Sequence, residues 1–198
     1  MREAAGASPV TNAYPAFLRL ADRRVLLAGG GRVAAGKLTG LLEAGARVTV
    51  VAPRIAIDLE RPGVDLLRRP FEEADLDGRW FVVAAATPEV NQRVARAAET
   101  RHIFVNAVDD PEAATAYLGG VVRKGGVTLA ISTGGRAPAL AGLLREALES
   151  LLPEDLGVWT VAAERLRARW REERVPIGAR RPLLLRALDE LYATRSSP

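Results

Sequence analysis

The chain has 198 residues, 48% of them hydrophobic and 26% charged, which is a globular composition with room for one full domain and a smaller appended part. It has no cysteine and one histidine, His102, so disulfides, thiolate catalysis and metal sites built on cysteine or histidine clusters are excluded. The net charge of +4 comes from arginines interleaved with acids, and aromatic residues make up only 5%. No concentrated basic stripe or stacking platform results, and we expect no nucleic-acid partner.

No stretch of the sequence approaches the roughly 20 consecutive apolar residues of a membrane helix, so no membrane partner is expected. The N-terminal residues carry one early arginine and lack the apolar core of a secretory signal. The sequence therefore predicts a cytoplasmic location.

The first half of the chain alternates short apolar runs with helical patterns. Strands are expected at 24–30, 47–53, 64–71, 80–87 and 102–108. Helices are expected at 33–45, which stops at Gly45, and at 88–100, with Pro88 in the first turn. Continuous apolar strands joined by helices are typical of a parallel sheet covered on both faces. The prediction is an α/β domain, a Rossmann-like doubly wound parallel sheet, at residues 1–111.

The second half changes pattern after residue 111. Two strands are expected within 116–133 around a glycine-rich turn at 124–126, and an amphipathic helix over 137–152 ends before Pro153. These elements have no sheet of their own to join, so residues 112–152 are predicted to be a small α+β dimerisation segment. Residues 153–198 are predicted to form a C-terminal helical segment.

A glycine motif, Gly29-x-Gly31-x-x-Ala34, lies between the first strand and the first helix. In a dinucleotide-binding turn, the first glycine allows a tight turn, the second lets the backbone approach a pyrophosphate, and the small third residue keeps helix and sheet close. The alternative is a glycine-rich turn without a ligand. The sequence context favours a nicotinamide dinucleotide, and the predicted cofactor-binding residues here are Gly29, Gly30, Gly31, Arg32, Val33 and Ala34.

Further cofactor contacts are expected where the other strands end. The second strand lacks the acidic residue that would bind a ribose and ends instead in Pro53 and Arg54. Arg54 either meets a 2′-phosphate or lies in solvent, which leaves NAD and NADP both open. Thr87, after the fourth strand, is a further candidate, and Asn106 on the fifth either hydrogen-bonds nicotinamide or substrate or merely finishes the strand.

Several segments taken together resemble one enzyme family. They are YPAFLRLADRRVLLAGGGRVAAGKLTGLLEAGARVTVVAP, NQRVARAAE, IFVNAVDDPEAA and LAISTGGRAPALAGLLREALESLLP, in that order. They resemble precorrin-2 dehydrogenase, which is also the N-terminal part of bifunctional and trifunctional sirohaem synthases. The resemblance implies NAD-dependent oxidation of precorrin-2 to sirohydrochlorin in a homodimer that exchanges its central segment. Some members of the family also insert ferrous iron.

The resemblance also implies a catalytic residue. It makes Asp109 the general base, and the same carboxylate would hold a metal ion if the protein is also a chelatase; no other metal ligand is expected. The alternative from the residues alone is that Asp109 or Asp110 caps a turn before Pro111, and Asp110 is the expected turn former. This chain departs from the family at Ala116 and Gly119, where a phenylalanine and a proline are usual.

The stretch before the 137–152 helix combines hydroxyls, glycine backbone and a guanidinium near a helix N-terminus, which together favour an anion. Precorrin-2 is a polycarboxylate, so these residues are predicted to bind substrate, the alternative being a plain helix cap. They are Ser132, Thr133, Gly134, Gly135 and Arg136.

Two other functions stay open from the sequence. One is a bifunctional dehydrogenase and ferrochelatase, and the other is a dimeric NAD(H)-sensing module without chemistry. His102 is expected to be a sheet residue, and Trp80, Trp159 and Trp170 are expected to be packing groups.

Overall fold

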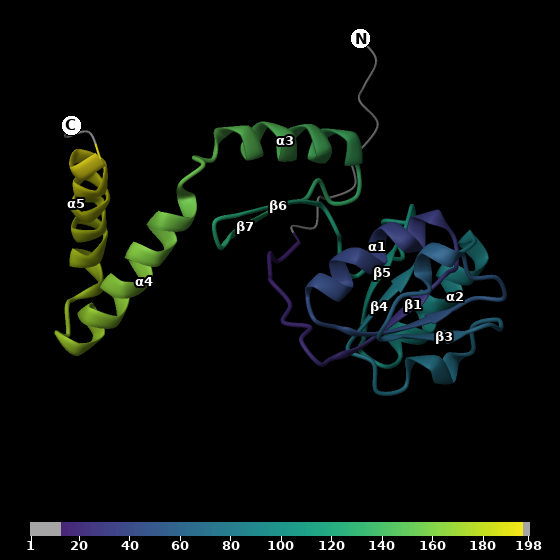
Figure 1. Cartoon of the computed structure of the whole chain (residues 1–198). Helices are drawn as coiled ribbons and strands as arrows, with labels where there is room; N and C mark the ends of the chain where they lie inside the picture. The colour runs from purple at the N-terminus through teal and green to yellow at the C-terminus, as the bar shows by residue number, and fades with distance from the viewer. Residues whose placement is uncertain (1–12, 196–198) are drawn as a thin grey trace, which may run out of the picture. The chain divides into compact units, whose positions relative to one another are not determined.

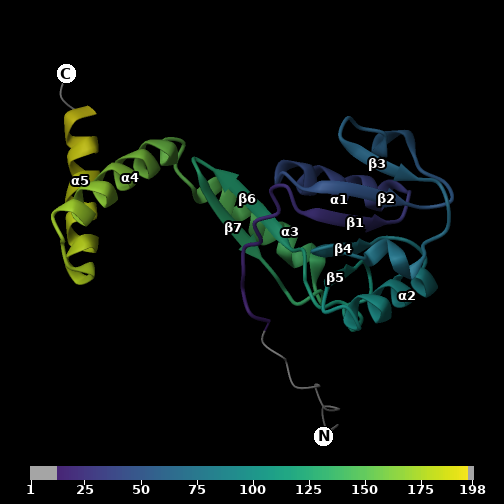
Figure 2. The same cartoon turned by 90° about the horizontal axis from the view of Figure 1, so that it is seen from below.

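The structure is a computed structural model that describes residues 13–195. Its first unit is built on a parallel sheet of five strands, which are β1 (Arg24–Ala28), β2 (Arg47–Val51), β3 (Val64–Leu67), β4 (Phe81–Ala84) and β5 (Phe104–Ala107). The strand order β3-β2-β1-β4-β5 places β1 between β2 and β4 (Figure 1, and Figure 2, where β2 is also labelled). The chain thus reverses its direction of travel across the sheet between β1 and β4, which is where open α/β sheets bind ligands. The predicted doubly wound sheet is confirmed.

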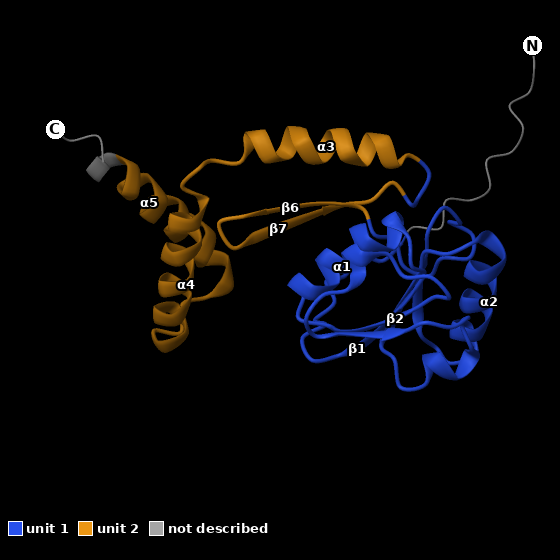
Figure 3. Ribbon diagram, turned by 45° about the vertical axis from the view of Figure 1, so that its right-hand side comes forward, with its two compact units in different colours: residues 1–118, 134–136 blue, residues 119–133, 137–198 orange. Residues whose placement is uncertain are grey.

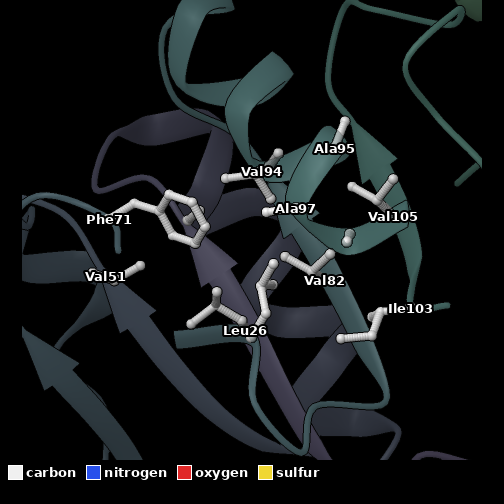
Figure 4. Close-up of a cluster of buried hydrophobic side chains, with 13 residues drawn as sticks. Leu26, Val51, Phe71, Val82, Val94, Ala95, Ala97, Ile103 and Val105 are labelled. Carbon is white, nitrogen blue, oxygen red and sulfur yellow. The ribbon is translucent and has the colours of Figure 1, made fainter. Parts of the chain in front are cut away.

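The two faces of the sheet are covered by α1 (Arg32–Glu43) and α2 (Pro88–Glu99). Alternate residues of each strand point to opposite faces, so Leu26 and Val82 pack with α2 while Leu27 and Val83 pack with α1. Figure 4 shows the α2 side, where Val94 and its neighbours meet the sheet. Burial on both sides explains why the strands are apolar without alternation.

All five strands of this sheet are shorter than the sequence suggested, and two of the differences have a visible cause. Strand β3 ends at Leu67, because the chain turns away from the sheet there. Arg69 then pairs with Asp75 of the short 3-10 helix η2 (Glu73–Leu76). Strand β5 begins only at Phe104, and the expectation that His102 is a sheet residue is wrong. His102 is exposed and lies in the turn before β5 with a φ of 55°, a left-handed conformation that no strand accommodates. A second 3-10 helix, η1 (Ile57–Leu59), lies between β2 and β3.

The second unit contains an antiparallel hairpin of β6 (Gly120–Lys124) and β7 (Val127–Ile131), as expected. Gly125 and Gly126 join the strands with φ values of 56° and 80°, and two adjacent left-handed residues form the turn that matches strand twist. Helix α3 (Pro138–Leu151) packs on β6, where the backbone of Ala141 approaches Gly120.

Two further helices, α4 (Leu156–Glu172) and α5 (Ile177–Arg195), complete this unit (Figure 2). The Thr160 hydroxyl of α4 donates to the Gly125 carbonyl at 2.6 Å, which fastens α4 to the hairpin. Trp159 meets Tyr192 edge to face, and its indole N–H donates to the Tyr192 hydroxyl at 2.6 Å. Trp170 is buried, whereas Trp80 is 58% exposed and lies under the guanidinium of Arg23.

The chain divides into two compact units (Figure 3). The first comprises Met1–Leu118 with Gly134–Arg136, and the second comprises Gly119–Thr133 with Ala137–Pro198. Within residues 13–195, no helix is both long and apolar enough to cross a bilayer. The predicted boundaries at residues 111 and 152 stay a prediction.

Candidate functional site

The glycine turn after β1 has two crowded residues and one open one. A Cβ added to Gly29, whose φ is 137°, would collide with the carbonyl of Ala85, and one added to Gly30 would collide with the carbonyl of Arg54. Gly31 has no atom within 4 Å of such a Cβ. Gly29 and Gly30 thus serve the packing of the turn, while the space beside Gly31 is free for a ligand to approach the backbone.

Helix α1 begins directly after this open glycine. Gly31 is its N-cap, and neither a side-chain cap nor an acidic residue occupies the first turn. The first amides of a helix have no partner inside it, and with the helix dipole they attract phosphate. An open backbone followed by uncapped amides therefore fits a dinucleotide pyrophosphate. Arg32 and Val33 are exposed in the first turn of α1, whereas Ala34 is buried against the sheet.

The N-terminus of α2 differs in its electrostatics. Thr87 is its N-cap residue and Glu89 lies in its first turn. The Glu89 carboxylate accepts hydrogen bonds from its own backbone N–H and from the Thr87 side chain, which lowers its pKa. A carboxylate already complements this helix end, so α1 is the better anion site of the two. Thr87, predicted as a cofactor contact, is exposed beside it.

The loop after β2 packs against the glycine turn. The Ala56 N–H donates to the Gly30 carbonyl at 2.8 Å, and the Arg54 carbonyl approaches Gly30. Pro53 and Arg54 are exposed. The structure thus gathers the predicted glycine residues and the predicted Pro53–Arg54 pair at one edge of the sheet.

A pocket of about 200 Å³ lies where β4 and β5 end. It is lined by Ala86, Pro88, Asn91, Val108, Asp109 and Asp110. Asp109 is exposed and has a φ of 59°, which few residues other than glycine, asparagine and aspartate adopt. Asp110 behaves as expected for a turn former, since its Oδ1 accepts the Ala113 N–H at 3.1 Å. The two neighbouring aspartates therefore have different surroundings, and Asp109 is the one presented to solvent.

Asn106 is buried on β5, with 7% of its surface exposed. Its Nδ2 donates to the Ala116 carbonyl at 2.9 Å, while its Oδ1 has no hydrogen-bond partner among the described residues. The amide nitrogen therefore serves the fold by holding the segment after Asp110 beside β5. The amide oxygen is a free buried acceptor, and a role in binding nicotinamide stays a prediction.

The predicted substrate stretch is divided between two tasks. The Thr133 hydroxyl accepts the Ala137 N–H at 3.1 Å, a local bond directly before α3, whose N-cap residue Ala137 has no side-chain cap. Gly134 and Gly135 have φ values of 62° and 75°, and a Cβ on Gly135 would lie 3.0 Å from the Pro111 ring. Gly134–Arg136 thus belong to the same unit as Asp109 and pack against the residue that follows Asp110. Substrate binding by Ser132, Thr133, Gly134, Gly135 and Arg136 stays a prediction.

The two departures from the family pattern have local explanations. Ala116 packs on the α1-side core, and its N–H donates to the Val105 carbonyl at 2.9 Å. Gly119 lies so close to β7 that a Cβ would collide with the Ile131 carbonyl. A proline ring at this position would not fit the chain as it is packed here.

Sequence reasoning missed Asn91, which is the most buried polar residue of the pocket wall, with 3% of its surface exposed. Its amide hydrogen-bonds the Ala86 N–H and the Val108 carbonyl. One signal was available, because Asn91 shares the buried stripe of its helix with Val94, Ala95 and Ala98. A polar side chain in such a stripe requires partners inside the protein.

Comparisons with known proteins agree with this geometry. A family model described as NAD(P)-binding matches residues 16–120, and a model described as the central part of a sirohaem biosynthesis protein matches residues 124–151. Sirohaem synthases of Salmonella typhi and Citrobacter koseri are 44% and 45% identical over 172 residues, which is 84% of this chain. The chain spans only 38% of the length of those relatives.

A solved structure titled "SirC, precorrin-2 dehydrogenase" superposes with a TM-score of 0.70 and 27% identity, over 90% of this chain and 91% of the other. Together these matches confirm the resemblance derived from the sequence motifs. The chain therefore belongs to the NAD(P)-binding family whose model spans residues 16–120, and 172 residues align with one part of the sirohaem synthases.

Proposed function

We propose that the protein oxidises precorrin-2 to sirohydrochlorin with NAD as the hydride acceptor. The observation that carries the proposal is the pairing, at one sheet edge, of the open Gly31 backbone before the uncapped helix α1 with the pocket that presents Asp109. The relatives named sirohaem synthase and the structure titled precorrin-2 dehydrogenase support the choice of substrate.

The bound nicotinamide supplies the acceptor for a hydride, and the protein supplies the rest of the chemistry. Dehydrogenation removes one hydride and one proton from the substrate, so a base is required. Asp109 is suited to take the proton on its carboxylate because it is exposed in the pocket, whereas the Asp110 carboxylate is committed to a turn. The first amides of α1 would hold the pyrophosphate, and Gly134–Arg136 would orient the carboxylates of precorrin-2.

The choice of NAD over NADP follows the family resemblance. Arg54 is the residue at the end of β2 that is able to contact a 2′-phosphate. Measuring turnover with each cofactor, in the natural protein and in Arg54→Glu, tests this choice. We expect a preference for NAD, and a larger loss of NADP activity than of NAD activity in the variant.

The proposal extends to a homodimer in the cytoplasm. The alternative of an added ferrochelatase activity would use ferrous iron as a second substrate with Asp109 as a ligand. The alternative of an NAD(H)-sensing module requires cofactor binding without turnover.

One experiment separates these functions. The pure protein is mixed with enzymatically made precorrin-2 and NAD, and absorption spectra are recorded with and without ferrous iron. Conversion to sirohydrochlorin without iron supports the dehydrogenase, a further change with iron adds the chelatase, and NAD binding without conversion supports the sensor.

Asp109→Asn is the decisive variant. Asparagine keeps the size of the side chain and accepts the left-handed backbone, yet it cannot take a proton, so turnover should fall about 100-fold or more. Asp110→Asn keeps an oxygen for the Ala113 N–H and should retain most activity. NAD affinity should survive both changes. Full activity in Asp109→Asn would remove this carboxylate from the mechanism, and loss only in Asp110→Asn would move the base to its neighbour.

A further inference from the structure

The side chain of Asn91 joins two loops that leave adjacent strands. Its Oδ1 accepts the Ala86 N–H at 2.9 Å, and its Nδ2 donates to the Val108 carbonyl at 3.2 Å. Ala86 follows β4, and Val108 follows β5. One buried amide thus bridges the place where the two strands diverge, at the wall of the Asp109 pocket.

The second of these bonds acts on the turn that carries Asp109. The Asp110 N–H approaches the Ala107 carbonyl at 3.5 Å, which closes a four-residue turn with Val108 second and Asp109 third. Asp109 has a φ of 59°, and Val108 is not among the residues of positive φ. A negative φ at the second residue followed by a positive φ at the third is the φ pattern of a type II turn.

Type I and type II turns differ mainly in the peptide between their second and third residues, which is rotated so that its carbonyl faces the other way. In this turn that peptide joins Val108 to Asp109, and its carbonyl is the acceptor of the Asn91 amide. A type I turn would require Asp109 to move to a φ of about −90°. The direction of its side chain would change with it.

We propose that Asn91 is a positioning residue, which holds the Val108–Asp109 peptide in the type II orientation and so aims the Asp109 carboxylate into the pocket. The same amide ties this orientation to the loop at Ala86, beside the N-terminus of α2. The catalytic part of the inference rests on the proposed function of Asp109 as base, whereas the structural part does not.

A double-mutant cycle tests the catalytic part. Asn91→Ala should lower kcat for precorrin-2 at least tenfold, since small misplacement of a catalytic group costs factors of this size, with KM and NADH affinity changed less than threefold. Combined with Asp109→Asn, it should add less than a further threefold loss, because the carboxylate that it positions is already gone. The matched control is Gln92→Ala, an exposed neighbour on the same helix, which should retain the natural kcat. Losses that multiply in the double variant would overturn the proposal.

Asn91→Asp gives a second readout that a purely structural role would not produce. A protonated carboxyl can both accept the Ala86 N–H and donate to the Val108 carbonyl, whereas the ionised form cannot donate and repels that carbonyl. Relative to the natural protein, kcat of this variant should fall as the pH rises through the pKa of the new acid. If the ratio of the Asn91→Asp kcat to the natural kcat stayed constant across a pH range in which circular dichroism shows a folded protein, the proposal would be contradicted.

Hydrogen exchange tests the turn without any activity. In Asn91→Ala, amide exchange should accelerate at least tenfold in peptides covering 84–92 and 105–112 and stay unchanged in β1 and β2. Unchanged exchange in both peptides would overturn the proposal that Asn91 holds the Val108–Asp109 peptide. Faster exchange in Asn91→Ala, combined with a natural protein that fails to oxidise precorrin-2, would support the positioning role of Asn91 and reject the proposed function, so the two failures are distinguishable.

Discussion

Several residues with a positive φ lie where the candidate site is built. Gly29, Asp109 and Gly135 all have positive φ, and each lies at a turn of the first unit that borders the glycine loop or the Asp109 pocket. Glycine adopts such angles without cost, and aspartate tolerates them because its short side chain hydrogen-bonds locally. Most substitutions at these positions would therefore change folding as well as function, and Asp109→Asn avoids this only because asparagine also tolerates a positive φ.

Gly31 is the position that separates the two effects. Its φ of −101° and ψ of −172° suit any residue, and nothing lies within 4 Å of a Cβ there. Gly31→Val should therefore fold with a melting temperature within a few degrees of the natural protein. It should nevertheless weaken NAD binding at least tenfold, because the branched side chain occupies the space that the pyrophosphate requires. Titration of NADH fluorescence measures the affinity.

Gly30→Val is the matched comparison. Its Cβ would meet the Arg54 carbonyl, which is backbone and cannot easily move. This variant should lose stability as well as NAD binding. Natural NAD affinity in a folded Gly31→Val would place the dinucleotide elsewhere.

At the scale of elements, the connection from β3 to β4 depends on a polar cluster instead of a full helix. Asp75 of η2 is 7% exposed, and its Oδ2 accepts hydrogen bonds from Arg69 Nη1 and from the Glu72 N–H, each at 2.9 Å. The Arg79 guanidinium donates to the Asp75 carbonyl and to the Thr49 hydroxyl of β2. The cluster thus fastens this crossover to the α2-side face of the sheet.

Asp75→Asn should destabilise the fold by about 2 kcal/mol at pH 7, the range for hydrogen bonds to charged groups. Burial raises the pKa of Asp75, but the hydrogen bonds from Arg69 and Glu72 outweigh it and the net pKa is lowered. A carboxyl with a lowered pKa stabilises the folded state above its unfolded pKa, near 4, and loses that effect as the pH falls through the folded value. The difference between the two proteins should therefore shrink below about pH 4. Urea unfolding at pH 7 and at pH 3 measures both quantities.

Asp77→Asn is the control for this prediction. Its carboxylate pairs with Arg101 at 3.1 Å but is 69% exposed, and exposed pairs contribute little. Its unfolding midpoint should match that of the natural protein at both pH values. An equal loss for Asp75→Asn at both pH values would show that charge is not the cause.

At the scale of the whole molecule, the second unit leaves apolar surface uncovered. Four leucines of α3 fall on one stripe and are at least 40% exposed, namely Leu140, Leu143, Leu144 and Leu151. Apolar surface of this kind is typical of subunit interfaces. We therefore propose that residues 112–152 form much of the contact in a homodimer.

Light scattering at micromolar concentration should give twice the chain mass for the natural protein. Leu143→Glu places a charge in the stripe and should shift the population toward monomer, with at least a tenfold weaker dimer. Leu143→Met retains the apolar character and should leave the mass unchanged. A monomer in the natural protein would contradict the proposed interface.

Much of the architecture was predictable because it depends on neighbours in the chain. The apolar runs of the five strands, the glycine motif before α1 and Pro88 at the start of α2 are local patterns, and the structure confirms them. The role of Asp110 as a turn former was predictable for the same reason, since its hydrogen bond reaches only to Ala113. The family motifs, confirmed by the comparisons, followed from the order of such local patterns.

Other features were decided only by tertiary contacts. Asp109 adopts its left-handed backbone in a turn whose central carbonyl is bound by Asn91, a residue from a different element. The early end of β3 and the need for glycine at position 119 likewise depend on Asp75 and Ile131, which approach only in the folded chain. The sequence by itself determined the sheet and the glycine turn, because period and local turn chemistry encode them, and the family resemblance of its motifs named Asp109 as the candidate base. The folded chain decided how that base is aimed, because the direction of one peptide depends on a hydrogen bond between residues that the linear pattern does not bring together.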